Sequence, residues 1–285
     1  MTKPVNLSTK IFLDSGDPQE TKRALDTLGF LDGQTTNPTL VSKNPHITEL
    51  KENGALTEET IWNEYRNVAS EIHAVIPEGS ISVEVYADDQ TDYESMLEKG
   101  RELSRWFDGI FVKLPVTSVG LRVAETLVKE GVNINMTLCF SQEQAAAVHA
   151  ATRGARRGQV YVSPFIGRLD DTGVRGLDLV ENIVRMYGEW GSHVLVLGAS
   201  IRNLEHLFEC FERKVDIVTV PIAMIEAWKA HGIENPLGEQ DPSVLASIPF
   251  VDLKEKDFTA YDINHPLTDA GIGKFSSDWK NLFSK

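Results

Sequence analysis

Residues 109–139 read GIFVKLPVTSVGLRVAETLVKEGVNINMTLC, and this stretch carries the pattern that decides the fold. A short apolar run at Gly109–Pro115 is followed by Ser118–Glu130, where apolar residues recur at intervals of three and four, and then by a second apolar run at Val132–Cys139. Short runs rich in β-branched residues are typical of buried strands, and the three-to-four spacing is typical of an amphipathic helix. The stretch therefore predicts a strand, a helix and a second strand.

The same unit recurs along the chain. Further apolar runs lie at Lys10–Asp14, Gly33–Asn37, Ile81–Tyr86, Gln159–Phe165, His193–Ser200 and Asp216–Pro221. Helical spacing is found at Asp17–Leu28, Tyr93–Phe107, Gln142–Arg153, Leu177–Gly188 and Arg202–Glu212. Eight buried strands that alternate with helices predict an α/β fold, a (β/α)8 barrel with a parallel sheet. A doubly wound open sheet is the alternative, but it usually has fewer repeats and a glycine-rich first turn, and no GxGxxG or GxxxxGKS occurs here.

Two regions depart from the repeat. Residues 39–80 are too long for one crossover helix and predict a helical insertion with helices at His46–Asn53 and Thr57–Val75. Residues 231–285 lie beyond the eighth strand, with an extended part up to about residue 265 and a helix predicted at Ala270–Phe283. We expect one barrel domain over residues 1–285, with this terminal helix packed on it or on a neighbouring subunit.

Composition and charge restrict the class of protein. The 41% hydrophobic and 25% charged residues are typical of a globular chain, which excludes disorder as the main class. A net charge of −14 repels phosphate backbones and anionic lipids, so we expect no nucleic-acid partner and no membrane partner. No apolar run approaches the ~20 residues of a membrane helix, and no signal peptide is visible, so we expect a cytoplasmic protein.

The cysteines and histidines give no sign of a metal site. Cys139 and Cys210 form no CxxC pair and stand in apolar stretches, which favours inert buried thiols over a disulfide or metal ligands. The seven histidines show neither HxH nor HExxH spacing.

Polar residues interrupt or end seven successive predicted strands. Active sites of (β/α)8 barrels lie at the carboxyl ends of the strands, so these residues are candidates for function. Asn135 and Thr137 lie two positions apart and face the same side of a strand. The candidates from these strands are Asp14, Asn37, Glu84, Lys113, Asn135, Thr137, Ser163, Phe165 and Ser200.

Lys113 is the most informative candidate. It is flanked by Phe111, Val112, Leu114 and Pro115, so burial strips its amine of water. Desolvation disfavours the ammonium form, and a neutral amine attacks ketones and aldehydes to form an iminium ion. The alternative is a lysine that extends from a strand end to pair with a carboxylate. Carboxylates predicted on neighbouring strands favour the functional interpretation.

Asp14 and Glu84 are candidates for the acid and the base that imine chemistry requires. Carbon–carbon bond cleavage needs a base for the substrate hydroxyl and an acid for the carbinolamine. Thr137 is a candidate to hold the water that relays the proton. Alternatively, the two carboxylates are structural counter-ions, or Asp14 is a helix N-cap.

Arg168 and Arg202 follow two strand ends and suggest an anionic substrate. Ser200 and Arg202 lie at a predicted helix N-terminus, where free N–H groups favour anions. Two guanidinium groups can hold a phosphate through paired hydrogen bonds. The alternative is surface ion pairs with Asp170, Asp171 or Glu205.

Together these residues resemble the transaldolase family, class I Schiff-base enzymes on a (β/α)8 barrel. The matching segments are FLDSGD, TTNPT, SVEV, FVKLP, NINMTL, SPFIGR and GASIRN, in family order over residues 10 to about 230. The resemblance implies transfer of a dihydroxyacetone unit from a ketose phosphate such as fructose 6-phosphate to an aldose phosphate such as erythrose 4-phosphate, in the pentose phosphate pathway. It implies no cofactor and no metal.

The resemblance also implies a role for each candidate. Lys113 forms the imine, Asp14 is the acid and base at the sugar hydroxyl, and Glu84 with Thr137 handles water and protons. The implied binding residues are Asn37 and Asn135 for the dihydroxyacetone hydroxyls with Ser163 nearby, Phe165 as a wall, and Arg168, Ser200 and Arg202 for the phosphate.

The tail, HPLTDAGIGKFSSDWKNL, resembles the C-terminal helix of the short transaldolase and fructose-6-phosphate aldolase subgroup, which implies a homo-oligomer in which this helix packs on a neighbour. The 39–80 connection and the 231–262 extension depart from that subgroup. Aldolase relatives usually have Tyr at the position of Phe165 and Gln at that of Glu84, which favours a transferase here. The alternatives are a fructose-6-phosphate aldolase, a transaldolase for another anionic ketose such as a sulfo-sugar, and a barrel that binds a sugar phosphate without catalysis.

Overall fold

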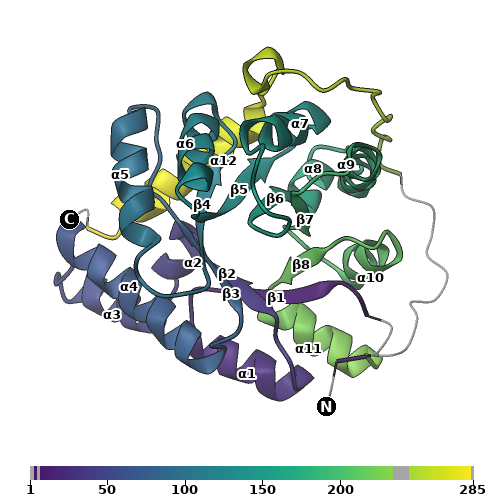
Figure 1. The fold of residues 1–285 in the computed structure, drawn as a ribbon. Coiled ribbons are helices and arrows are strands. Elements are labelled where there is room, and N and C mark those ends of the chain that lie inside the picture. The colour runs from purple at the N-terminus through teal and green to yellow at the C-terminus, as the bar shows by residue number, and fades with distance from the viewer. Residues whose placement is uncertain (1–2, 5–6, 234–243, 284–285) are drawn as a thin grey trace.

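The structure is a computed structural model, and it describes residues 3–4, 7–233 and 244–283. Eight parallel strands close into a barrel in chain order, and helices surround it (Figure 1). This confirms the predicted (β/α)8 fold. The strands are β1 (Lys10–Asp14), β2 (Gly33–Thr35), β3 (Ser80–Glu84), β4 (Ile110–Pro115), β5 (Asn133–Cys139), β6 (Val160–Pro164), β7 (Leu195–Gly198) and β8 (Ile217–Val220).

Most of the helices that follow the strands have the expected amphipathic faces. Thr117 and Ser141 cap two of these helices, because their side chains accept hydrogen bonds from the N–H groups of Gly120 and Gln144. These outer helices are α1 (Pro18–Leu28), α5 (Tyr93–Leu103), α6 (Ser118–Lys129), α7 (Gln142–Ala151), α8 (Ile166–Asp170), α9 (Gly176–Trp190), α10 (Leu204–Glu212) and α11 (Ile222–His231).

The long connection between β2 and β3 holds three helices where the sequence predicted two. The predicted pair is present as α3 (Pro45–Glu52) and α4 (Glu58–Val75). A short helix, α2 (Pro38–Ser42), precedes them, and Asn37 caps it by accepting a hydrogen bond from Leu40 N at 2.9 Å. Five residues are too few for an amphipathic period to be visible in the sequence.

Asn44 ties this connection to the first loop of the barrel. Its side-chain carbonyl caps α3 by accepting from His46 N at 2.9 Å, and its amide donates to Gly16 O at 2.8 Å. Asn44 is buried, so its removal takes away a helix cap and leaves a buried carbonyl unpaired.

We expect Asn44→Ala to lower the free energy of unfolding by about 2 kcal/mol, measured by urea denaturation. Thr57→Ala is the matched control, because Thr57 caps α4 at an exposed position without a bond to a distant backbone group. A loss no larger than that of the control contradicts the role of the Gly16 contact.

The C-terminal segment runs along the outside of the barrel and then crosses its mouth. Residues 244–265 pass over α7 and α9, where Gln142 bonds both the N–H and the carbonyl of Val251 at 3.0 and 2.6 Å. The final helix, α12 (Pro266–Lys280), contacts α2 and β5 at the carboxyl ends of the strands (yellow in Figure 1). It starts four residues before the predicted helix.

The structure also tests the predictions for the two cysteines and for membrane helices. Cys139 and Cys210 are buried free thiols, as predicted, and burial raises the pKa of each to about 12. Within the described ranges, no helix has the length and apolar character needed to cross a membrane.

Candidate active site

One layer of side chains inside the barrel holds the predicted catalytic centre. The strand register pairs Glu84 with Lys113 and Lys113 with Asn135, so these side chains point to the same face of the sheet. The Nζ of Lys113 lies 3.1 Å from Glu84 Oε2 and donates a hydrogen bond to Thr36 O at 3.2 Å. Lys113 and Glu84 are only 3% and 4% exposed, so the amine and the carboxyl form a buried pair.

Asp14 is the last residue of β1, and it lies close enough to Lys113 for the charge of the lysine to act on its carboxyl. Its Oδ1 accepts a hydrogen bond from Thr35 Oγ1 at 2.7 Å, and Thr35 in turn contacts Thr219 Oγ1 at 2.7 Å. Asp17 is the N-cap of the following helix, α1, so Asp14 is not an N-cap. This leaves the Asp14 carboxyl facing the cavity at the barrel mouth.

Burial raises the pKa of both carboxyls. For Asp14 and for Glu84, loss of hydration is the largest effect, and the nearby charge of Lys113 opposes it. A carboxyl with a raised pKa gives up and takes back a proton nearer to neutral pH than an exposed one does. Two such groups beside one amine can serve as its acid and its base.

Asn135 and Ser163 form a hydrogen-bonded pair across β5 and β6. Ser163 Oγ donates to Asn135 Oδ1 at 2.7 Å, and Asn135 Nδ2 donates to Ser82 Oγ at 3.0 Å. All three side chains are buried. The amide and the hydroxyl are therefore held in fixed orientations next to Lys113.

Thr137 lies two residues nearer to the carboxyl end of β5 than Asn135 and stands apart from this network. Its hydroxyl is buried and has no hydrogen-bond partner among the described residues. The next residue, Leu138, has a φ of 59°, where the pairing of β5 with β6 shifts in a bulge. A buried hydroxyl without a partner has an unused hydrogen-bonding capacity, which suits it to hold a water.

The mouth of the barrel opens into a cavity of about 330 Å³. Most of the predicted site residues line it, whereas Glu84, Asn135 and Thr137 do not and lie within the barrel wall. The predicted residues that line the cavity are Asp14, Asn37, Lys113, Ser163, Phe165, Arg168, Ser200 and Arg202.

The two predicted anion-binding arginines differ in their surroundings. Arg202 Nη2 pairs with Asp171 Oδ2 at 2.9 Å, which is the surface ion pair that the sequence left open for it. Among the described residues, no carboxylate lies within ion-pair distance of Arg168, because Asp170 pairs with His206 instead. Arg168 is therefore a cation at the mouth that no carboxylate of the described residues neutralises, and it can bind an anion.

The prediction that Ser200 and Arg202 form a helix N-terminus is wrong. The helix begins at Leu204, and Asn203 is its N-cap, accepting from His206 N. Ser200 instead has a φ of 60°, and its carbonyl accepts from Gly167 N at 3.0 Å. A Cβ on Gly167 would lie 2.5 Å from Arg202 Cγ, so this close loop packing places Arg202 beside Arg168.

The sequence did not reveal several residues at the cavity. Thr35 and Thr219 are polar residues in strands β2 and β8. The alternation of side chains along these strands could have indicated that they face the inside of the barrel. Lys43, Lys274 and Phe275 come from α2 and α12, and nothing in the sequence places these helices at the mouth. The lining residues missed from the sequence include Thr35, Thr39, Lys43, Thr219, Lys274 and Phe275.

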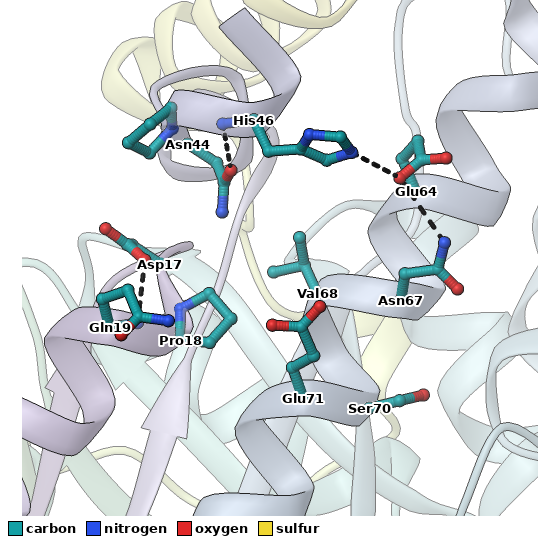
Figure 2. Close-up of a pocket in the computed structure, with 11 residues that line it drawn as sticks. Asp17, Pro18, Gln19, Asn44, His46, Glu64, Asn67, Val68, Ser70 and Glu71 are labelled. Carbon is teal, nitrogen blue, oxygen red and sulfur yellow. Dashed lines mark hydrogen bonds and ion pairs between the residues drawn. The ribbon is translucent and has the colours of Figure 1, made fainter. Parts of the chain in front are cut away.

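A second cavity, of about 470 Å³, lies outside the barrel between α1, α3 and α4 (Figure 2). Several of its polar groups are engaged with one another: Glu64 pairs with His46 at 3.5 Å and accepts from Asn67. None of the residues drawn in Figure 2 is a predicted site residue. The mouth cavity is therefore the candidate active site.

Within the described residues, no group of three or more His, Cys, Asp or Glu side chains is placed to hold a metal ion.

A (β/α)8 barrel with a lysine buried between carboxylates at its mouth defines a class of enzyme that acts on carbonyl compounds through an imine. The comparisons with known proteins identify the family. The sequence model described as transaldolase/fructose-6-phosphate aldolase matches residues 11–285. The chain belongs to this family and is an enzyme of the transaldolase type.

Named relatives align over nearly the full length. The chain is 36% identical over 273 residues to a probable transaldolase of Dehalococcoides mccartyi, covering 96% of this chain and 99% of the relative. It is 34% identical over 276 residues to a probable transaldolase of Brucella ovis, covering 97% and 99%.

Proposed function

We propose that this protein transfers a dihydroxyacetone unit from a ketose phosphate, such as fructose 6-phosphate, to an aldose phosphate, such as erythrose 4-phosphate. The observation that carries the proposal is the buried Lys113, 3.1 Å from Glu84 and open to the same cavity as the unpaired Arg168. In this cavity Lys113 can react with a ketone, and Arg168 can bind an anion. The names of the family and of the aligned relatives support the same reaction.

In the proposed reaction, the Lys113 amine attacks the C2 carbonyl of the ketose. Loss of water from the carbinolamine gives an iminium ion, with Glu84 supplying and receiving the protons and the Thr137 hydroxyl holding the water. Both groups lie in the barrel wall next to Lys113, away from bulk solvent.

Asp14 then removes the proton of the C4 hydroxyl. The electron pair of the C3–C4 bond moves into the iminium ion, which gives an enamine on Lys113 and releases the aldose phosphate. The enamine carbon then attacks the aldehyde of the acceptor, which forms the new carbon–carbon bond and restores the iminium ion. Hydrolysis of this iminium ion releases the product ketose and frees Lys113. Asn37, Asn135 and Ser163 are the proposed partners of the dihydroxyacetone hydroxyls.

The phosphate of either sugar is proposed to bind Arg168, with Ser200 and Arg202 beside it and Phe165 as a wall. Burial lowers the pKa of Arg168 from its usual value, and the charge of Arg202 acts in the same direction. A bound dianion relieves both effects, because it replaces lost hydration and compensates two positive charges.

Other expectations from the sequence stay predictions. These are the pentose phosphate pathway, a cytoplasmic location, a homo-oligomer and a single domain with the 39–80 insertion and the 231–285 extension. Part of that extension, residues 234–243, lies outside the described residues.

We expect little free dihydroxyacetone from fructose 6-phosphate alone, and rapid three-carbon transfer once erythrose 4-phosphate is added. Phe165 carries no hydroxyl that can protonate the enamine, so the three-carbon unit stays on Lys113 until an aldehyde arrives. A coupled assay of both products, repeated with a sulfonated ketose as donor, measures this. Rapid release without an acceptor supports an aldolase instead, and preference for the sulfonated donor supports a different anionic substrate.

A further inference from the structure

Arg168 is held between two aromatic rings that come from distant parts of the chain. Its guanidinium carbon lies 5.0 Å from the centre of the Phe165 ring and 5.3 Å from that of Phe275. Phe165 directly precedes α8, which carries Arg168, whereas Phe275 stands on α12 and is 6% exposed. Both distances are within the range of a cation–π contact.

Gly271 allows α12 to approach this arginine closely. It lies four residues before Phe275, on the same face of the helix. A Cβ at Gly271 would lie 2.8 Å from Arg168 Nη1 and 2.6 Å from Leu138 Cδ2. Any side chain at this position therefore displaces the Leu138 side chain, the guanidinium or the helix.

The same face of α12 is anchored at β5. Thr268 Oγ1 donates to Leu138 O at 2.9 Å and accepts from Gln144 Nε2 at 2.8 Å. Thr268, Gly271 and Phe275 follow the three-and-four spacing of one helical face. The helix is thus fixed at one end on the strand that carries Asn135 and Thr137, and it presents Phe275 to Arg168.

We infer that Gly271 and Phe275 are positioning residues that hold the Arg168 guanidinium toward the cavity, and that they set the preference for phosphorylated over unphosphorylated substrates. This inference rests on the proposed function, in which Arg168 receives the phosphate. A free arginine side chain has many rotamers, and the two rings fix one of them before the anion binds. The hydrogen bond and the ion pair of Lys113 involve Thr36 and Glu84, and the cation–π contact of Phe275 involves Arg168, so the two residues act at different groups of the cavity.

Phe275→Ala tests the inference because it removes one ring and leaves Arg168 in place. We expect KM for erythrose 4-phosphate to rise about tenfold, the size of one desolvated cation–π contact. The ratio of KM for erythrose 4-phosphate to KM for unphosphorylated glyceraldehyde therefore rises about tenfold, because glyceraldehyde carries no phosphate for Arg168 to bind. Phe275→Tyr keeps a ring over Arg168 and restores the low KM.

Gly271→Ala is a second, independent variant, because it crowds Arg168 instead of removing its support. We expect the same selective rise in KM. Ile272→Ala is the matched control: Ile272 is on α12 but lines a different cavity, beside Pro115 and Asp269. It leaves the KM values for both acceptors unchanged, and thermal unfolding shows that all variants are folded.

Binding of inorganic phosphate, measured by calorimetry, separates this inference from the proposed function. If the protein transfers no three-carbon unit, the proposed function fails, while a selective loss of phosphate affinity in Phe275→Ala still supports the positioning role. The inference is overturned if phosphate affinity is unchanged in Phe275→Ala. It is also overturned if KM rises equally for both acceptors, or if Ile272→Ala has the same effect.

Discussion

Lys113→Ala abolishes the covalent adduct that borohydride traps between fructose 6-phosphate and the protein, and lowers turnover by at least about 10³-fold. The amine is the proposed nucleophile, and no other lysine lies within ion-pair distance of Glu84 in the described chain. Mass spectrometry of the digested adduct locates the label at Lys113 in the unaltered protein. The proposed mechanism fails if the label is found at a different lysine.

The controls for this experiment address folding and access to the cavity. Truncation of Lys113 leaves Glu84 buried without its partner, which destabilises a protein unless the carboxyl is protonated. Lys113→Met fills the volume of the lysine, and its thermal unfolding shows whether the barrel is intact. Lys43→Met removes another lysine that lines the cavity and is expected to keep the adduct at Lys113.

Asp14→Asn lowers kcat by about 10²- to 10⁴-fold but keeps the trapped adduct. The proposed base acts on the C4 hydroxyl after the imine has formed, so its loss blocks bond cleavage and not imine formation. Asparagine has nearly the same shape and still offers an oxygen to Thr35 Oγ1. Rapid-quench experiments measure the adduct and the released aldehyde separately, and loss of both at once contradicts the assignment.

The pH dependence of the unaltered protein follows from the raised pKa of the same carboxyls. A base must be deprotonated to act, so the acidic limb of kcat/KM is expected above the pH of about 4 that is usual for carboxyls. Because Asp14 and Glu84 interact with one amine, the limb belongs to the group and not to one residue. A limb at the ordinary carboxyl pH contradicts the effect of burial.

Stability changes with pH in the opposite direction to activity. When the pKa of a carboxyl is higher in the folded than in the unfolded state, its favourable contribution is present below the unfolded pKa and is lost as pH rises through the folded pKa. We therefore expect Asp14→Asn to gain thermal stability relative to the unaltered protein at pH 8 but not at pH 4. At neutral pH the ionised Asp14 carboxyl therefore lowers the free energy of unfolding, and the same carboxyl is the proposed base of the reaction.

The strands and most helices were predictable because their signals are local. The run KIFLD at Lys10–Asp14 is β1 with the predicted boundaries, and Ser118–Glu130 differs from α6 by a single residue. A period of two or of three to four residues is visible in a short stretch of chain. The short helices α2 and α8 span only five residues each, so neither showed a period.

The Ser200 loop shows where local signals mislead. A serine between an apolar run and a helical segment is a common N-cap pattern, but here Asn203 is the cap. Ser200 has a left-handed φ of 60°, and its carbonyl accepts a hydrogen bond from Gly167 N, which belongs to a different βα unit. No local pattern reports such a pairing.

The sequence by itself determined the order of strands and helices and the chemical groups that each strand end carries, because these depend on neighbours along the chain. The tertiary structure decided which groups meet: Lys113 with Glu84, Arg202 with Asp171, and Arg168 with Phe275. The first of these contacts needs β3 paired with β4, and the third needs α12 to cross the mouth. They join residues from different elements, and Arg168 and Phe275 are 107 positions apart in the sequence. The distance in space between such residues depends on how the elements pack. It does not depend on a local period in the sequence.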